Sequence, residues 1–319
     1  MLSYEFKTYI ANGSERYAFV EQGLDNAAMT TKSSPFPESL LSLVYLDIDQ
    51  LKPLFDEMGI ALTKLLETRE AQYADEIYAA LRVLPLHHVY FELLRLDWKY
   101  RLDRARALGF EFAGNLLQRR ELYVLPDDLR IMQGQIKELF AHVLDIDSEK
   151  TSAPDRMTAY YKSAGDGAFR FRPQPMGFEL VYGKDFAEVL YPNSVYDLID
   201  YQLRECVKRE IKMRVCKNCG RWFAVTGHTG TEYCDRPFDE KGRTCKEMGA
   251  IAVWAKNKSD DQVFKAYRRE YKKRFAWIKA GKIEQADFYA WSRQAREKKT
   301  ACDNGKLTLE AFTDWLAKT

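Results

Sequence analysis

The sequence predicts a mainly α-helical protein with a minor β component: a helical N-terminal domain, a small cysteine-rich knuckle and C-terminal helical hairpins. Three observations support this prediction. Apolar residues recur at helical spacing through residues 38–146, four cysteines lie between positions 216 and 245, and two similar helical motifs follow them. A chain of 319 residues is also long enough for more than one domain.

These patterns divide the chain into four parts. Residues 1–150 are predicted to form an acidic, mainly helical domain that begins with a β-hairpin. Residues 151–195 are predicted to be a linker with short strands, and residues 196–260 contain the cysteine knuckle. Residues 261–319 are predicted to form a basic helix and two helical-hairpin repeats.

The hairpin is predicted at residues 4–10 and 16–20, because Asn12-Gly13 between them is the strongest short hairpin signal. The small and polar residues 22–37, with their prolines, predict a loop.

In the helical part, Pro85 is expected to end one helix and Pro126 to precede another over residues 129–143. His87 and His88 could suggest a metal or acid/base pair. Adjacent residues on a helix point about 100° apart, so we expect ordinary core or surface histidines.

The middle of the chain is predicted as a polar linker over residues 147–170, followed by short strands at 169–172 and 178–182 and a short helix at 185–190. Ser194 is a suitable N-cap for a further helix over residues 197–213. Cys206 lies inside that helix and is expected to be a buried core residue.

The cysteines at the centre of the knuckle are spaced as C-x2-C, fourteen residues, C, ten residues, C. Thiolates are the ligands that Zn²⁺ prefers, and a structural zinc takes four ligands in a tetrahedron. We therefore predict one structural Zn²⁺, held by Cys216, Cys219, Cys234 and Cys245. Cys245 is expected to open a helix over residues 246–256.

Other interpretations of the cysteines stay open. His228 could replace Cys234 or Cys245 as a ligand, and the C-x2-C pair could be a redox pair or free thiols. A closed set of four ligands argues against a catalytic zinc, which needs an open position for water. Cys302 has no ligand partner in sequence and is expected to be a free thiol.

The string Arg214-Val-Cys-Lys-Asn-Cys-Gly-Arg-Trp-Phe223, with Tyr233-Cys234 after it, resembles the bacterial CGNR-type zinc-finger proteins, which have a treble-clef-like knuckle. The resemblance covers about residues 195–280 and implies a helical domain, a knuckle and a basic helix in that order. The chain differs in the spacing of both cysteine pairs and has Cys245-Lys-Glu-Met248 where that family has Cys-Gly-Asn-Arg. The whole chain resembles an uncharacterised bacterial family of the Clostridia type, from which no activity follows.

Charge is unevenly distributed, although the net charge is only +2. Residues 204–319 contain 27 Lys and Arg against 16 Asp and Glu, a net of +11, and residues 1–203 contain 22 against 31, a net of −9. A basic half suggests a polyanionic partner. Alternatively, the two halves attract each other or carry solvated charge.

A helix is predicted over residues 261–279, with aromatic residues on one side and cations on the other. We expect the cations to contact nucleic-acid phosphates, although an aromatic stripe is usually core and a cationic face is often only solvated. The candidate nucleic-acid-binding residues are Arg214, Arg221, Arg243, Lys246, Lys265, Arg268, Arg269, Lys272 and Lys273.

The C-terminal repeat has an offset of 24 residues. Gly281-Lys-Ile283 followed by Phe288 and Trp291 matches Gly305-Lys-Leu307 followed by Phe312 and Trp315. Such short hairpins suit oligomerisation or docking of a protein partner.

No phosphate-binding loop, dinucleotide fingerprint, zinc-protease motif or nucleophile elbow occurs in the sequence, so we do not expect an enzyme. We predict a zinc-stabilised nucleic-acid-binding protein, a transcriptional regulator or a mobile-element accessory protein. The alternative is a protein–protein interaction module, and a third hypothesis is a new enzyme in the acidic half. The absence of a secretion signal and of an apolar run of ~18–20 residues predicts a cytoplasmic protein without membrane contact.

Overall fold

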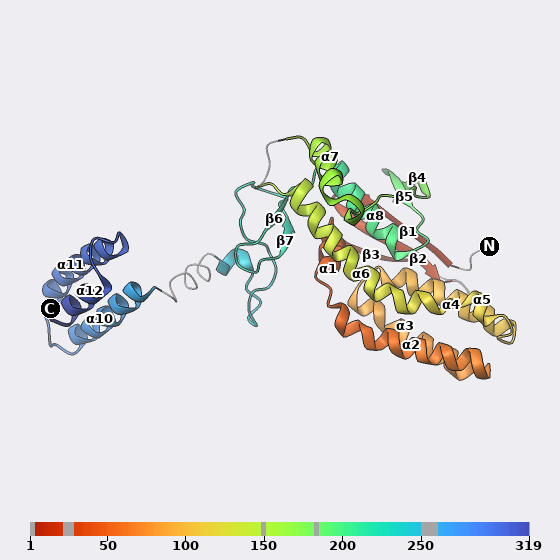
Figure 1. The fold of residues 1–319 in the computed structure, drawn as a ribbon, viewed down its shortest axis with the longest axis horizontal. Helices are drawn as coiled ribbons and strands as arrows, with labels where there is room; N and C mark the ends of the chain where they lie inside the picture. The colour runs from red at the N-terminus through yellow and green to blue at the C-terminus, as the bar shows by residue number, and fades with distance from the viewer. Residues whose placement is uncertain (1–3, 22–28, 148–150, 182–184, 250–260, 319) are drawn as a thin grey trace. The chain divides into compact units, whose positions relative to one another are not determined.

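The computed structural model describes residues 4–21, 29–147, 151–181, 185–249 and 261–318 (Figure 1). The fold is mainly α with minor β, as predicted: helices account for 59% of it and strands for 15%. The chain divides into two compact units. Met1–Arg214 and Trp222–Thr229 form the first unit, and Val215–Arg221 and Gly230–Thr319 form the second.

The first unit contains a five-stranded antiparallel sheet with the strand order β3-β2-β1-β5-β4. The strands are β1 (Tyr4–Ala11), β2 (Ser14–Glu21), β3 (Thr30–Pro35), β4 (Met176–Val181) and β5 (Asp185–Leu190). The predicted hairpin is confirmed: Asn12 and Gly13 have φ angles of 52° and 73° and join β1 to β2.

Two predictions for this sheet are wrong. Residues 30–35 are not part of a loop but form the edge strand β3, whose side chains are exposed or half-buried. A strand that stands at the edge can be polar, which is why its composition resembles that of a loop. Residues 185–190 form β5 and not a helix. Their short apolar pattern is compatible with either structure, and hydrogen bonding to β4 and to Thr8 and Tyr9 of β1 makes them a strand.

The predicted helical region 38–146 is confirmed. It contains α1 (Glu38–Val44), α2 (Ile48–Thr68), α3 (Ala71–His87), α4 (Phe91–Ala107), α5 (Ala113–Leu116), α6 (Arg119–Leu139) and the π-helical turn η1 (Phe140–Leu144). Pro85 and Pro126 lie inside α3 and α6, where they were expected at helix boundaries. Pro126 shares the buried face of α6 with Leu122 and Leu129, so packing outweighs the lost backbone hydrogen bond.

The predicted linker 147–170 contains a helix, α7 (Ala153–Ala164), and the 3₁₀ turn η2 (Gly165–Gly167). Ser152 caps α7 by accepting a hydrogen bond from the backbone N–H of Asp155, 3.3 Å away. This cap is a helix start signal that the polar composition obscured. Residues 169–172 do not form the predicted strand, whereas β4 coincides with the strand predicted at 178–182.

Helix α8 (Val195–Lys208) begins at Ser194 with a capping box to Asp197, as the sequence predicted. It ends before the expected position, and Met213 belongs instead to the short strand β6 (Met213–Val215), which pairs with β7 (Trp222–Ala224). Cys206 is fully buried in α8, which confirms the prediction of a buried core residue. Helices α1, α2, α3, α4 and α6, the turn η1 and α8 share one continuous apolar core with the sheet.

The second unit contains the knuckle and three C-terminal helices, α10 (Gln262–Lys279), α11 (Gln285–Asp303) and α12 (Leu309–Lys318). The repeat is visible in its turns. Gly281 and Gly305 adopt positive φ, and the next N–H donates back to Trp277 O (2.9 Å) or Ala301 O (2.8 Å), which ends α10 and α11 in the same way. The core of this triplet is Ala266, Phe288, Trp291, Ala295, Phe312 and Leu316.

None of the described helices is long and apolar enough to cross a membrane.

Candidate metal centre and nucleic-acid interface

The four predicted ligands converge on one point. The Sγ atoms of Cys216, Cys219, Cys234 and Cys245 all lie within 4.8 Å of one another, and those of Cys219 and Cys234 are 3.7 Å apart. A tetrahedral zinc with Zn–S bonds of about 2.3 Å requires sulfur atoms about 3.8 Å apart. The four cysteines could therefore hold one metal ion, and the group does not include His228.

The first pair of cysteines stands on a tight turn. The N–H of Gly220 donates to Cys216 O, and the N–H of Cys216 donates to Arg221 O, both at 2.9 Å. These two bonds fold residues 216–221 into a loop whose two sulfurs face the same side. The N–H of Lys217 also donates to Glu232 O (3.1 Å), which attaches this turn to the chain that leads to Cys234.

The second pair is placed by a loop and a helix start. The N–H groups of Cys245 and Lys246 donate to Arg236 O and Cys234 O, each at 2.9 Å. Thr244 and Glu247 form a reciprocal capping box, at 2.7 and 3.2 Å, so Cys245 is the first residue of a helix, as predicted. Most of the predicted helix 246–256 lies outside the described residues.

Gly249 allows this short helix to pack closely on the knuckle. A Cβ atom at Gly249 would overlap the ring of Tyr233, with Cε1 only 2.8 Å away, and would lie 3.1 Å from Asn218 Cβ. Asn218 in turn donates from Nδ2 to the sulfur of Cys245 at 3.3 Å. The residues around the cysteines are thus packed to hold the sulfurs in place.

The sulfurs differ in their surroundings. Burial raises the pKa of the Cys216 thiol, but backbone N–H groups of Cys219, Cys234 and Asn218 outweigh it and lower that pKa to about 7. Burial raises the pKa of Cys234 and of Cys245. Donors aimed at a sulfur are typical of a thiolate that binds a cation, because they stabilise its negative charge.

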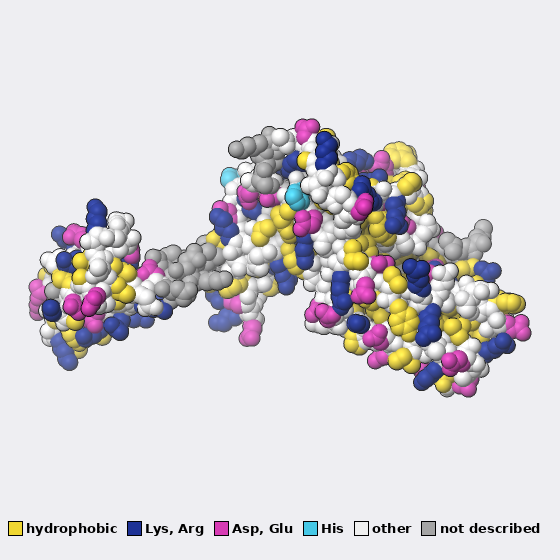
Figure 2. All heavy atoms as spheres, viewed as in Figure 1, with side chains coloured by type: hydrophobic (Ala, Val, Ile, Leu, Met, Phe, Trp, Pro, Cys, Tyr) yellow, Lys and Arg dark blue, Asp and Glu magenta, His cyan; other side chains and the backbone are white. Residues whose placement is uncertain are grey.

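The second candidate feature is the cationic face of α10. Lys265, Arg268, Arg269, Lys272 and Lys273 are all exposed, and Figure 2 shows Lys and Arg gathered over this helix. Lys273 pairs with Glu270 at 3.3 Å. Within the described part of the chain, the other four form no ion pair, so we call Lys265, Arg268, Arg269 and Lys272 the α10 cationic row.

An exposed aromatic ring continues this row. Phe275 follows Lys272 by three residues and precedes Lys279 by four, so all three lie along one side of α10. Its side chain is 45% exposed, and the Lys279 ammonium lies 5.8 Å from the ring centroid. The predicted aromatic stripe is partly core, as Tyr271 and Phe275 both contact the buried Phe288.

Three of the four candidate cations near the knuckle, Arg214, Arg243 and Lys246, pair with carboxylates. Arg214 is nearly buried and donates to both oxygens of Asp147 (2.6 and 2.7 Å) and to Thr229 O (2.8 Å). Its side chain therefore links two segments of the first unit. Arg243 pairs with Asp239, and Lys246 with Asp235 at 3.5 Å. Arg221 is exposed.

Sequence reasoning missed a buried polar cluster in the first unit. Glu15 is fully buried and accepts hydrogen bonds from Ser39 N (2.6 Å), Ser39 Oγ (2.7 Å) and Ser34 Oγ (2.7 Å). Tyr17 and Tyr90 lie within 3.0 Å of Ser39 Oγ. No signal marked Glu15 in the sequence, since an acidic residue in a hairpin strand is usually solvated.

His88 belongs to the same cluster. Its Nε2 lies 2.9 Å from Ser39 O, which can only accept, so Nε2 carries the proton, and Nδ1 accepts from Tyr90 N–H (3.2 Å). Burial lowers the pKa of His88 to about 4. Burial also raises the pKa of Glu15 to about 7, although the hydrogen-bond donors around its carboxylate act to lower that pKa. A histidine with both ring nitrogens engaged is structural, as expected.

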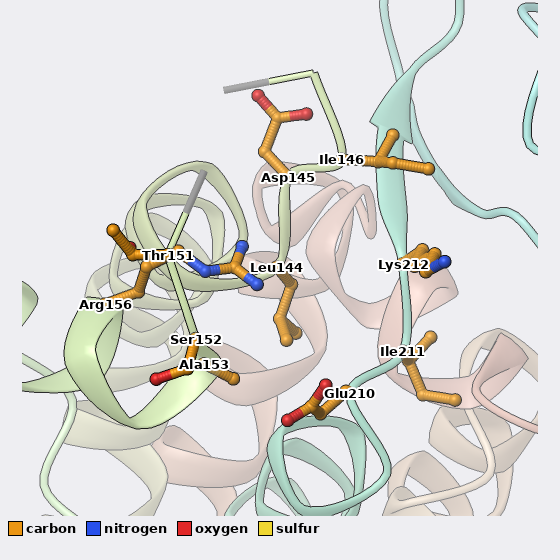
Figure 3. A pocket seen from close by; sticks show the side chains of 10 residues that line it. All are labelled: Leu144, Asp145, Ile146, Thr151, Ser152, Ala153, Arg156, Glu210, Ile211 and Lys212. Carbon is orange, nitrogen blue, oxygen red and sulfur yellow. The ribbon is translucent and has the colours of Figure 1, made fainter. Parts of the chain in front are cut away.

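A pocket of about 250 Å³ lies between η1, the start of α7 and the segment after α8 (Figure 3). Arg156 points toward its middle, and Asp145, Glu210 and Lys212 also line it. The lining holds two cations and two carboxylates, so it has no formal net charge.

Comparisons with known proteins bear on the C-terminal part of the chain. Residues 183–317 match the model of a family of unknown function, DUF6076. This match spans β5, α8, the four cysteines and the three C-terminal helices. Searches of curated proteins and of solved structures found no match.

Proposed function

We propose that the four cysteines bind one structural Zn²⁺ and that the protein binds nucleic acid through the α10 cationic row. The fit of the sulfur separations to a zinc tetrathiolate supports the metal assignment. All four positions are taken by protein sulfur, so the ion would stabilise the knuckle and carry out no chemistry. The resemblance to CGNR-type zinc-finger proteins is in keeping with this assignment.

The α10 cationic row carries the nucleic-acid proposal. Four neighbouring cations without acidic partners among the described residues keep their charge available for phosphates. Helix α10 has seven Lys and Arg against one Glu, a net charge of +6. Contacts between such a row and a phosphate backbone release condensed counterions, so the affinity gained is large at low salt and independent of base sequence.

The test is a fluorescence-anisotropy titration of the full chain with labelled single-stranded and duplex DNA of random sequence at several KCl concentrations. The variant Lys265→Gln/Arg268→Gln/Arg269→Gln/Lys272→Gln should bind at least tenfold more weakly. Its log K versus log [KCl] slope should be roughly 3 units shallower, since each lost phosphate contact removes about 0.7–0.9.

A matched control removes the same charge elsewhere. Lys52, Arg82, Arg104 and Lys162 are exposed in the first unit, and their replacement by Gln should leave both affinity and slope unchanged. Equal losses in both variants would mean that only net charge matters. No binding by the unmodified protein at low salt would overturn the proposal, and it would favour the protein–protein interaction module.

A further inference from the structure

A second binding site is indicated in the first unit, where a pocket of about 450 Å³ lies between α4, α6 and the start of α8. Its floor is apolar: Leu93, Met132 and Val195 are buried, and Val124 and Leu125 of α6 form the wall. This volume falls within the range of small-molecule sites, which are mostly apolar with a few placed polar groups.

The acidic groups on one wall are already satisfied. Arg101 pairs with Asp97 at 2.5 Å and with Glu121 at 2.8 Å, so this guanidinium bridges both carboxylates. Tyr4 also donates its hydroxyl to Asp97 at 3.2 Å. With one guanidinium against two carboxylates, this wall has a formal charge of −1 and offers no unpaired cation to a ligand.

Two further arginines line the pocket and, unlike Arg101, are not paired with a carboxylate of the described ranges. Arg172 and Arg120 line the pocket, and neither forms an ion pair with any residue that the structure describes. With Asp128, the lining holds three arginines and three carboxylates, so its formal net charge is zero, and Arg172 and Arg120 are the cations in it that remain available to an anion.

Arg172 is also held in position. Its backbone N–H donates to Asp200 Oδ2 (2.7 Å), and its carbonyl accepts from Arg204 Nη2 (2.8 Å). The guanidinium carbon lies 3.9 Å from the ring centroid of Tyr196, which also lines the pocket. A guanidinium fixed by stacking loses little entropy when it binds an anion, and its planar fork matches a carboxylate.

We infer that this pocket binds a small amphipathic organic anion, with its carboxylate or similar head on Arg172 and Arg120 and its apolar body against α6. This inference goes beyond the proposed function, because it concerns the first unit and needs neither metal nor nucleic acid. It gives the helical unit a ligand of its own.

Isothermal titration calorimetry of the full chain with 1-naphthoate and the neutral 1-naphthylmethanol tests this inference. Naphthoate should bind about tenfold more tightly than the alcohol, and Arg172→Gln should remove this difference, because a charge-assisted hydrogen bond is lost. Arg120→Gln should reduce it, and Leu125→Trp, which fills the apolar wall, should weaken both probes.

The control is Arg170→Gln. Arg170 stacks on Tyr161 at 5.1 Å in the same manner but does not line the pocket, so this variant should bind naphthoate as the unmodified protein does. Equal affinity for the acid and the alcohol, an unchanged Arg172→Gln variant, or no heat with either probe at millimolar concentration would each overturn the inference.

Discussion

The sulfur atoms of Cys219 and Cys234 lie 3.7 Å apart, although fourteen residues separate them in the chain. One cysteine comes from a tight turn and the other from a loop that precedes a helix. Their separation is close to the edge of a zinc tetrathiolate tetrahedron, about 3.8 Å. A shared metal ion would explain why a turn and a loop that are distant in the chain place their sulfurs together.

Replacing Cys216 by Ser should remove the metal, because three ligands bind far more weakly than four and structural zinc supplies folding free energy. The measurement is the zinc content of the purified protein by elemental analysis, which should fall from about one ion per chain to near zero. Cys302→Ser is the control and should retain its zinc, since Cys302 lies outside the cluster. Zinc retained by both variants would contradict the four-cysteine site.

Gly249→Ala should destabilise the knuckle by about 1–3 kcal/mol, as overpacking does, because the new methyl group would overlap the Tyr233 ring. Faster zinc release to a chelator is the expected readout. Gly134→Ala on α6, where nothing lies within 4 Å of the new Cβ, should leave release unchanged and raise helix stability by up to about 1 kcal/mol. Equal release rates in both variants would show that the packing on Tyr233 does not matter.

Glu15 and His88 should give opposite pH dependences of stability. The folded-state pKa of Glu15 is raised from 4.5 to about 7, so its contribution is present below pH 4.5 and declines as pH rises toward 7. The folded-state pKa of His88 is lowered from 6.5 to about 4, so its contribution is present above pH 6.5 and declines as pH falls toward 4. Each shift corresponds to about 3 kcal/mol.

The unmodified protein should therefore show little net pH dependence from this pair between pH 4.5 and 6.5. Glu15→Gln should make stability rise with pH in that window, and His88→Gln should make it fall, as measured by urea unfolding at several pH values. Glu111→Gln, at an exposed position, serves as the control. Parallel curves for the Glu15 and His88 variants would refute the opposed titrations.

Phe275→Leu should weaken binding of single-stranded DNA by roughly tenfold and leave duplex binding unchanged, because an exposed ring beside cations can stack on an unpaired base. Tyr289→Leu on α11 is a control with a similarly exposed aromatic ring outside α10. Anisotropy titrations of both variants with single-stranded and duplex DNA are the measurement. If Phe275→Leu weakened duplex binding as much as single-strand binding, stacking on an unpaired base would be excluded.

Local signals in the sequence identified much of this structure. Ser194 and the Asn12-Gly13 turn set the ends of elements through their own hydrogen bonds or φ angles, so these elements could be predicted from single residues. The cysteines were found in the same way, because their spacing and chemistry are local properties.

The remaining features depend on contacts between distant residues. Residues 185–190 become a strand only because β1 and β4 pair with them, and Pro126 is tolerated because α6 is packed along one face. Glu15 is buried because Ser34 and Ser39, far along the chain, supply donors. Periodicity and composition carry no information on such partners, so neither the cluster nor the pocket beside Arg172 could be predicted.

The shared position of α11 in the C-terminal repeat limits how this region can be shortened. This helix closes the first motif and opens the second, and Phe312 and Leu316 of α12 complete the core that α10 and α11 begin. A fragment that ends after the turn at Gly305 would lack α12, so Phe288 and Trp291 would lose their contacts with the core residues Phe312 and Leu316. The three helices consequently share one core, so a shortened chain should keep all three of them or none.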